Sequence, residues 1–442
     1  MNTKILTIIL FFALTTSVAS ADWLQFHHNP ERTGNVSGYA PLTDTLLWKT
    51  VLNDTSYIGG GACIMGGRVY ISNWAGWPIT DERGLYCLNE TTGEIIWHNP
   101  IGGFGGVSTP AISGDRLFVG SSIGDLYCVN ALNGTTIRNR TIESNPLYWG
   151  VGSCPLIYEN TVFVNTASGG ALFAFDFDGN ELWNITTGTY GAYPPTAIYY
   201  ISPAAYDRKI FFGGAGPALY CVDIETHNEL WNFSTTGTVS TTPAVDDGIV
   251  YFATESRIYA VNMAGAEVWS QSLKGTISSP AISNGKIYIG DKDKKINCIN
   301  ANNGTTIWSQ TIGGSCLSSP VVANGMVYTA ANYAKGTVYG FDAETGDLKW
   351  TYDTNEYNMA QPAVSDGILF IGSDSGYLYA FRDPIPEGDL NLDWAVTVTD
   401  AFIALQMAVG AVPAVDGADM NGDNKVTSLD ALMILQAAVG AD

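Results

Sequence analysis

Oxygen-bearing side chains recur at matched spacing in two segments near the C-terminus of this 442-residue chain. Ca²⁺ takes six to eight oxygen ligands, and a curled loop of twelve residues supplies them from positions 1, 3, 5, 7 and 12. Side chains that fit positions 1, 3, 5 and 12 are Asp389, Asn391, Asp393 and Asp400 in the first segment, and Asp419, Asn421, Asp423 and Asp430 in the second. The sequence therefore predicts two calcium ions.

Two further positions bear on these loops. Position 7 contributes a backbone carbonyl, which belongs to Ala395 in the first loop and to Lys425 in the second. Position 6 usually holds glycine, because the chain turns sharply there. Asn424 tolerates a left-handed conformation in the second loop, whereas Trp394 does so poorly in the first. The first site is therefore expected to be weaker or distorted.

Each loop leads into a predicted amphipathic helix. Phe402, Leu405 and Val409 share one helical face after the first loop. The second loop is followed by the matching set Leu432, Leu435 and Val439. So small a module has little core, and bound metal should supply much of its stability. A short linker, residues 382–388, precedes the module, which spans residues 389–442.

These duplicated loops and helices resemble dockerin, a calcium-binding module that binds a cohesin domain on another protein. The resemblance implies a cohesin-domain protein as partner, with loop positions 10 and 11 helping to select it. Those positions hold Val398, Thr399, Ser428 and Leu429. The alternative is that these four residues only pack the module's own core.

Internal repetition organises the rest of the chain. Units of about 40 residues begin at a Pro-Ala or Pro-Val pair, contain alternating strands, and end in tryptophan, as in residues 280–308 and 320–350. Eight such units can be aligned, although the first has a degenerate start near Ala62 and the second ends in Arg138 in place of tryptophan. The last unit stops at Phe381 without its tryptophan strand. A strand around Trp48 precedes the first unit and can complete the last. The prediction is an all-β, eight-bladed propeller of four-stranded blades over residues 22–381, closed by the N-terminal strand.

The repeats resemble those of the quinoprotein alcohol dehydrogenase family. The segment of this chain that best matches the tail of that family's repeat is FDAETGDLKW at 341–350. That family includes enzymes that use pyrroloquinoline quinone (PQQ) and non-enzymatic scaffolds like the outer-membrane assembly factor. The enzymes carry adjacent cysteines beside the cofactor, and this chain has no such pair. No PQQ is therefore expected.

Charge and the N-terminal segment bear on location and partners. The formal charge of −22 opposes binding to nucleic acid and to anionic membranes. Residues 1–21 combine Lys4, an apolar stretch at 5–14 and small residues at 19–21, which predicts a secretory signal peptide. We expect an extracellular or cell-surface protein, with no membrane insertion once the signal is removed.

Aromatic residues in insertions between the repeat elements are candidates for stacking on a glycan or gripping a peptide. The alternative is simple loop packing. The candidates are Trp74, Trp77, Trp149, Tyr190 and Tyr193.

The sequence favours a non-catalytic propeller scaffold attached to a cohesin-bearing surface or secreted assembly. The dockerin resemblance implies polysaccharide catabolism as the setting. The alternative is an extracellular glycoside hydrolase or lyase on the propeller rim, and the third hypothesis is a quinone-dependent dehydrogenase. No spacing selects a catalytic residue.

Overall fold

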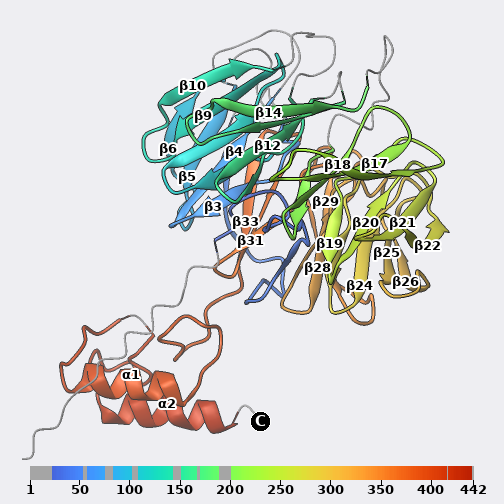
Figure 1. Cartoon of the computed structure of the whole chain (residues 1–442). Helices are drawn as coiled ribbons and strands as arrows, with labels where there is room; N and C mark the ends of the chain where they lie inside the picture. The colour runs from blue at the N-terminus through green and yellow to red at the C-terminus, as the bar shows by residue number, and fades with distance from the viewer. Residues whose placement is uncertain are drawn as a thin grey trace, which may run out of the picture. The chain divides into compact units, whose positions relative to one another are not determined.

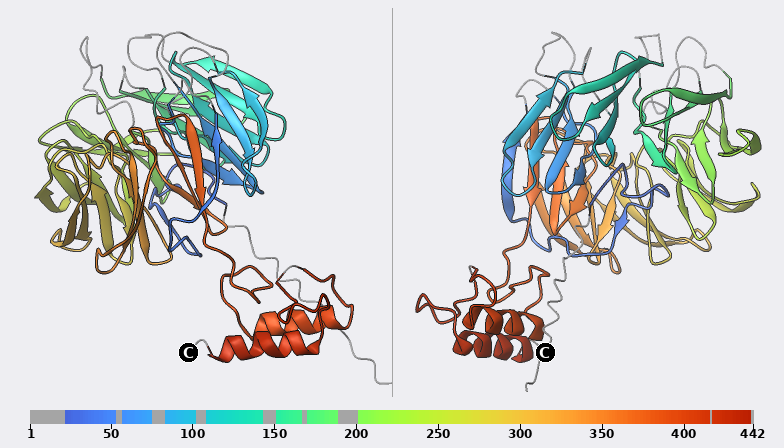
Figure 2. Two further views of the ribbon diagram at one scale, coloured as in Figure 1. Left: turned by 180° about the vertical axis from the view of Figure 1, so that it is seen from behind. Right: turned by 60° about the vertical axis from the view of Figure 1, so that its left-hand side comes forward.

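The computed structural model describes residues 22–52, 57–74, 83–101, 108–142, 151–166, 170–188, 201–415 and 417–440. The chain divides into two compact units, which meet between Asp383 and Pro384. Seven four-stranded sheets and one five-stranded sheet form the first unit and are set around a common centre (Figures 1 and 2). The predicted eight-bladed propeller is confirmed, and each sheet is called a blade below.

Each blade runs outward from a short three-residue inner strand, and all pairs within the repeats are antiparallel. The strands of blades 1 to 4, in order, are β3 (Cys63–Met65), β4 (Arg68–Ser72), β5 (Leu85–Asn89), β6 (Ile95–Asn99); β7 (Ala111–Ser113), β8 (Arg116–Gly120), β9 (Asp125–Asn130), β10 (Thr136–Thr141); β11 (Leu156–Tyr158), β12 (Thr161–Asn165), β13 (Ala171–Phe175), β14 (Glu181–Thr186); β15 (Ala204–Tyr206), β16 (Lys209–Gly213), β17 (Ala218–Asp223), β18 (Glu229–Ser234).

The remaining blades follow the same order. The strands of blades 5 to 8 are β19 (Ala244–Asp246), β20 (Ile249–Ala253), β21 (Arg257–Asn262), β22 (Glu267–Ser272); β23 (Ala281–Ser283), β24 (Lys286–Gly290), β25 (Lys295–Asn300), β26 (Thr306–Thr311); β27 (Val321–Ala323), β28 (Met326–Ala330), β29 (Thr337–Asp342), β30 (Leu348–Asp353); β31 (Ala363–Ser365), β32 (Ile368–Gly372), β33 (Tyr377–Phe381).

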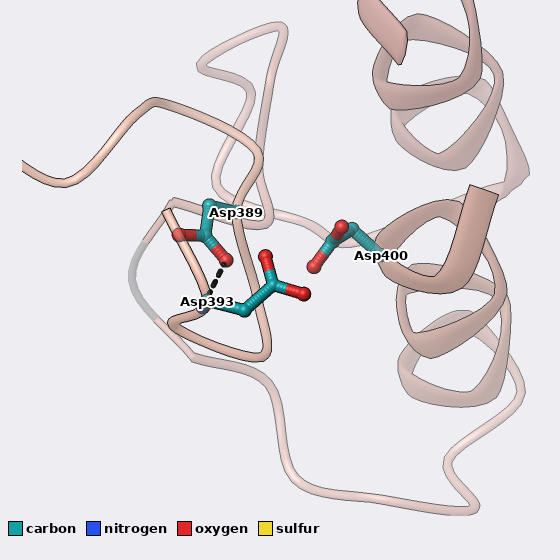
Figure 3. Close-up of side chains that lie close together, drawn as sticks. All are labelled: Asp389, Asp393 and Asp400. Carbon is teal, nitrogen blue, oxygen red and sulfur yellow. Dashed lines mark hydrogen bonds between the residues drawn. The ribbon is translucent and has the colours of Figure 1, made fainter. Parts of the chain in front are cut away.

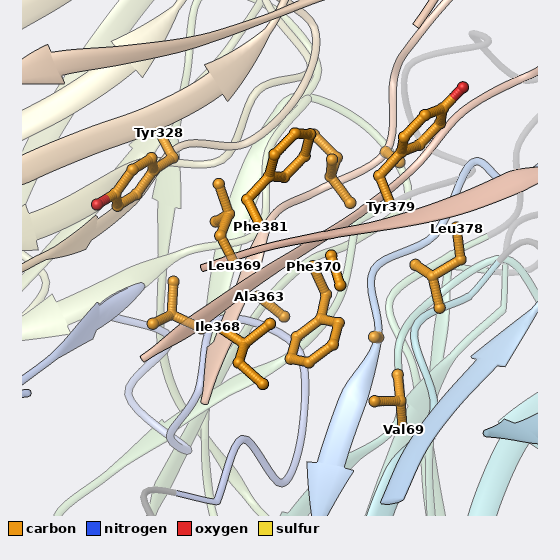
Figure 4. Packing of buried hydrophobic residues seen from close by; sticks show 14 of the residues in the cluster. Val69, Tyr328, Ala363, Ile368, Leu369, Phe370, Leu378, Tyr379 and Phe381 are labelled. Atoms are coloured by element: carbon orange, nitrogen blue, oxygen red, sulfur yellow. The ribbon is translucent and has the colours of Figure 1, made fainter. Parts of the chain in front are cut away.

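Blade 8 is completed by the N-terminal strand, as the sequence predicted. β2 (Leu46–Val51) pairs antiparallel with β33, with Lys49 opposite Tyr379. Buried residues of blades 7, 8 and 1 then form one apolar cluster, in which Tyr328, Phe370 and Val69 each lie (Figure 4). The closed ring leaves no blade at the end of a stack, where an exposed sheet face would invite association.

The terminal tryptophans pack between blades. The Trp97 indole Nε1 donates to the Ala131 carbonyl of the next blade at 3.1 Å, and Trp269 does the same to Ala301 at 2.7 Å. Each ring lies against a turn glycine of that next blade, for example Gly304 against Trp269. The Gly-x-x-x-Trp spacing of the repeats therefore supplies both halves of an interface between neighbouring blades.

Replacing Gly304 with alanine should lower the free energy of unfolding by more than about 2 kcal/mol, because two penalties add. Its φ is +75°, and an added Cβ would lie 2.6 Å from Cε3 of Trp269. Gly285 of the same blade is the control, because its φ is +70° but nothing lies within 4 Å of an added Cβ. Denaturant unfolding gives the loss of unfolding free energy for both variants, and the difference between the two losses measures the clash with Trp269. Equal losses would contradict the interface.

The segment before β2 crosses the propeller from blade to blade, which the sequence did not indicate. Trp23 exchanges backbone hydrogen bonds with Ile64 of β3, and β1 (Asn35–Val36) pairs parallel with β27. Between these ends, single hydrogen bonds join the segment to the inner strands of blades 2 to 6, from the N–H groups of Ile112, Ile157, Ala205, Val245 and Ile282. Residues 23–36 therefore contact seven inner strands in succession and are called the hub segment below.

Arg32 of the hub segment is fully buried. Its Nε donates to the Pro203 carbonyl at 3.1 Å, and its Nη1 donates to the Phe26 carbonyl at 2.6 Å. Its Nη2 donates to the carbonyls of Pro155 at 3.1 Å and Cys154 at 3.5 Å. One guanidinium thus ties the segment to blades 3 and 4.

The second unit holds two helices, α1 (Val398–Ala408) and α2 (Ser428–Gly440). Its small core consists of Ala401, Ala404, Ala431 and Ile434, with partly buried neighbours that include Leu390 and Met420. Among the described residues, no helix is both long and apolar enough to cross a bilayer.

Candidate metal centre

The first predicted calcium loop curls around the carboxylate of Asp389. Its Oδ1 accepts the N–H groups of Leu392 at 2.8 Å and Asp393 at 3.2 Å, and its Oδ2 accepts that of Trp394 at 2.8 Å. Asp393 in turn accepts the N–H of Ala395 at 3.0 Å. These bonds bend the chain back, so that the side chains at positions 1 and 5 lie on the inside of the turn.

Asp400 closes the loop from the start of α1. Its Oδ1 accepts the N–H groups of Leu390 at 2.8 Å and Asn391 at 3.1 Å, and its Oδ2 accepts both the N–H and the hydroxyl of Thr397. Thr397 caps the helix, with Asp400 as the reciprocal partner of a capping box. Position 12 is therefore held by both ends of the loop.

Three carboxylates of this loop face one another. Asp389, Asp393 and Asp400 each offer an oxygen, and these oxygens lie within 4.8 Å of one another (Figure 3). Asp389 and Asp400 are buried, whereas Asp393 is exposed. The side-chain amide of Asn391 donates to Asp393 at 2.8 Å, which places position 3 beside the same cluster. The donor set is all oxygen and anionic, which suits a hard cation such as Ca²⁺.

Electrostatics at Asp389 reflect this crowding. Burial raises the pKa of its carboxyl group, and the nearby charge of Asp400 adds to the rise. The backbone N–H bonds from Trp394, Asp393 and Leu392 oppose it. A divalent cation would relieve the repulsion between the carboxylates, because it supplies the opposite charge that the loop itself lacks.

The second loop repeats the pattern almost bond for bond. Asp419 accepts the N–H groups of Gly422 at 2.9 Å, Asp423 at 3.2 Å and Asn424 at 2.6 Å. Other bonds of the first loop also have counterparts: Lys425 donates to Asp423, Asn421 donates to Asp430 through its N–H, and Thr427 donates to Asp430. Of the two loops, both described at these positions, only the first brings three carboxylates within 4.8 Å.

Position 6 is left-handed in both loops, as the spacing requires. The φ of Trp394 is +62° and that of Asn424 is +65°. The Trp394 N–H bond to Asp389 holds this conformation, which an unsupported tryptophan would avoid. Weaker binding at the first site stays a prediction.

The four residues predicted to meet a partner lie at the starts of the two helices, and all are exposed: Val398, Thr399, Ser428 and Leu429. The apolar helical faces predicted from the sequence are not buried in a core. Phe402 is 57% exposed and Leu432 is 49% exposed. Alanines fill the contact between the helices, because their small side chains let the two backbones approach closely. The larger apolar residues are left on the surface of the module.

The predicted aromatic rim lies mostly beyond what the structure describes. Trp77, Trp149, Tyr190 and Tyr193 fall outside the described residues. Trp74 is half-buried, forms a backbone bridge with Tyr57, and meets its ring edge to face at 5.4 Å. Trp74 is therefore engaged in packing within blade 1 and its adjoining loop.

Two buried carboxyl groups of the propeller have perturbed acidities. Burial raises the pKa of Glu90 to about 7, and burial likewise raises that of Asp374 to about 7. Glu90 lies at the closure between blades 1 and 8, where its carbonyl accepts the Trp48 indole at 2.9 Å. Asp374 lies in the turn between β32 and β33. Their separate positions offer no paired acid and base.

Glu90 should make the propeller less stable as pH rises. Its folded pKa of about 7 exceeds the ordinary value of 4.5, so folding favours the protonated form. Stability is greatest below pH 4.5 and falls as pH rises toward 7, by up to about 3 kcal/mol. Glu90→Gln should flatten this fall, measured by denaturant unfolding from pH 4.5 to 7.5. Exposed Glu94→Gln is the control, and an unchanged slope in Glu90→Gln would contradict the assignment.

Comparison with known proteins bears on the propeller. A family model described as outer membrane protein assembly factor BamB matches residues 32–193, 174–257 and 254–384. The BamB of Yersinia pestis is 24% identical over 341 residues, which cover 70% of this chain and 83% of that protein. A tetrathionate hydrolase of Acidithiobacillus ferrooxidans is 24% identical over 358 residues, which cover 74% of this chain and 66% of that enzyme.

A solved structure shares the fold. The europium-containing methanol dehydrogenase superposes with a TM-score of 0.66 at 12% identity, covering 82% of this chain and 98% of that one. Identity this low establishes the common propeller alone. The family match ends at residue 384 and therefore does not include the C-terminal module.

Proposed function

Because the chain belongs to the propeller family described as outer membrane protein assembly factor BamB, we propose that it is an exported, non-catalytic binding scaffold. Its C-terminal module binds two calcium ions and attaches the propeller to a cohesin-domain protein. The observation that carries the proposal is the twin loop, in which Asp389 and Asp419 gather the same three backbone N–H groups.

Export is supported by the BamB relatives, whose name places them in the assembly of the outer membrane. The predicted signal segment 1–21 lies outside the described residues. An extracellular or cell-surface site, and a role beside polysaccharide catabolism, belong to the proposal. So does a glycan or peptide ligand on the propeller.

The docking surface is proposed to combine the helix starts with the exposed apolar faces. Val398 is 65% exposed and Leu429 is 53% exposed, and they are the apolar residues at loop positions 10 and 11, one in each half of the module. Apolar residues clustered on so small a surface favour a protein partner, because water solvates them poorly. Calcium acts at a distance from the partner, by holding the loops that orient both helix starts.

The test is binding of the full chain to immobilised cohesin domains, with calcium and with a chelator. Binding should require calcium, and Leu429→Asp combined with Val398→Asp should weaken it at least about tenfold, because a charge enters an apolar contact. Gln436→Asp is the control, since it adds one carboxylate at an exposed position farther along α2, away from the helix starts. Equal affinity of the wild-type chain, the double variant and Gln436→Asp for cohesin would overturn the proposed docking surface. Binding without calcium would overturn the proposed role of calcium in the module.

Two enzymatic alternatives remain to be tested. One relative is named a tetrathionate hydrolase, so the propeller family also supports catalysis. A carbohydrate-active enzyme on the rim would turn over glycans, and loss of turnover in a single carboxylate variant would replace the scaffold proposal. A quinone-dependent dehydrogenase would gain activity from added PQQ and calcium; the absence of PQQ is part of the proposal.

A further inference from the structure

A small cavity of about 30 Å³ lies at the centre of the propeller. It is bordered by the segments that lead into the inner strands of blades 1, 3, 6, 7 and 8, through Gly59, Gly152, Cys154, Ile277, Ser279, Leu317, Ser319, Met359 and Gln361. A space of this size holds one or two water-sized species.

The lining has a polar tier and a more apolar tier. The residue directly before each inner-strand proline is polar: Cys154, Ser279, Ser319 and Gln361. Two positions earlier the lining turns apolar, with Ile277, Leu317 and Met359. A species in the cavity therefore meets hydrogen-bonding groups on one side and partly exposed apolar side chains on the other.

Two hydroxyl groups of the polar tier keep a hydrogen to donate. Ser279 Oγ accepts the N–H of Thr242 at 3.0 Å, and Ser319 Oγ accepts the N–H of Ser279 at 2.9 Å. Each side chain is only 3% exposed, and neither hydroxyl donates to a group among the described residues. Two buried O–H donors therefore border the cavity.

A buried positive charge lies next to this tier. Arg32 donates to the carbonyl of Cys154 at 3.5 Å; Cys154 is one of the lining residues, and Arg32 lies behind it. Burial lowers the pKa of Arg32 to about 10, so the guanidinium still carries its charge at neutral pH. No carboxylate of the described residues lies within 4.0 Å of it, and its other partners are neutral carbonyls. In a low-dielectric interior such a charge attracts an anion strongly.

We propose that the cavity binds one small monovalent anion of halide size, held by the hydroxyl groups of Ser279 and Ser319 and attracted from behind the Cys154 carbonyl by the charge of Arg32. Hydroxyl donors and a cation favour an anion over a metal ion. A water molecule could accept the same hydrogen bonds, but it would bring no negative charge toward Arg32, whose attraction to a carboxylate comes from Glu31 beyond 4.0 Å. Binding links the hub segment to blades 6 and 7, so the anion should stabilise the closed ring.

The test is thermal unfolding of the full chain in sodium bromide against sodium gluconate, at constant ionic strength. The Tm should rise in bromide and saturate, and a crystal grown in bromide should show one anomalous peak beside Ser279 and Ser319. Ser279→Ala and Ser319→Ala should each raise at least tenfold the bromide concentration that is needed for the rise in Tm. Thr242→Ala is the control, because it loses an equivalent bond from the Ser202 N–H at 3.0 Å but does not line the cavity.

Three results would overturn the proposal. One is water without an anomalous peak at the site. Another is a rise in Tm that never saturates, which is a bulk salt effect. The third is a bromide response that Thr242→Ala weakens as much as Ser279→Ala does, since the loss would then follow the backbone hydrogen bond and not the cavity.

Discussion

Replacing Arg32 with alanine is expected to lower the free energy of unfolding of the propeller by about 3–5 kcal/mol, the largest effect of any single substitution considered. The change removes four hydrogen bonds at once. It leaves the carbonyls of Phe26, Pro155 and Pro203 buried without this donor. The segment that joins seven inner strands would lose its anchor between blades 3 and 4.

The measurement is the denaturant midpoint of the full chain, with Arg208→Ala as the control. Arg208 is half-exposed and its ion pairs are long, at 3.6 and 3.8 Å, so its loss should change stability by less than about 0.5 kcal/mol. Arg32→Lys should recover little, because one ammonium group cannot reach carbonyls on several sides. Equal midpoints for Arg32→Ala and Arg208→Ala would show that the hub segment does not depend on this residue.

Calcium uptake should fall stepwise when the first aspartate of each loop is replaced. The wild-type chain is expected to bind two ions, Asp389→Ala one, and the variant with Asp389→Ala and Asp419→Ala none. Each aspartate holds three backbone N–H groups, so its loss removes a ligand and also loosens the turn. The affinity of the altered loop should drop at least about 100-fold.

Isothermal titration of the full chain measures the stoichiometry, and circular dichroism measures helix formation on addition of calcium. At a calcium concentration 100 times the Kd, each occupied site stabilises the module by about 2.7 kcal/mol. Glu387→Ala is the control, because it removes an exposed carboxylate just outside the first loop. Two ions bound by the double variant would refute the ligand assignment, and unchanged helicity would refute the coupling to folding.

The features that sequence analysis predicted correctly are those in which partners repeat along the chain. Tryptophans and turn glycines recur in most of the repeats, so pairs such as Trp269 and Gly304 predict an interface between blades before the fold is known. The unmatched strand at Trp48 and the missing strand after Phe381 likewise predict closure, because a sheet edge needs a partner. The curl of the twin loops also follows from the sequence, since the partners lie within a few residues of one another, whereas calcium binding by these loops stays a prediction.

In the two helices of the C-terminal module, the sequence period did not determine which face of each helix is buried. Phe402 and Leu405 form one apolar stripe of α1, and Ala401 and Ala404 form another. A 3.6-residue period marks both stripes without saying which one packs. The structure buries the alanines, and the larger residues remain exposed. Only the closest approach of the two helices decides between them.

The polar tier of the cavity left a faint sequence signal. A hydroxyl or thiol residue precedes the inner-strand proline in six blades, at Thr109, Cys154, Ser202, Thr242, Ser279 and Ser319. The structure turns this repetition into a belt, in which the N–H of each blade donates to the side chain of the next. The repeated proline is visible in the sequence, but the donor and acceptor belong to different blades.

By itself, the sequence determined the eight repeats, the strand that closes them and the two carboxylate-rich loops, because each rests on contacts between near neighbours or on a period. Only the tertiary structure decided the path of residues 23–36 and the burial of Arg32, whose hydrogen-bond partners at Cys154 and Pro203 lie 122 and 171 residues away. A segment that contacts seven different blades along fourteen residues has no period of its own. Its interactions exist only after the ring has brought those blades together.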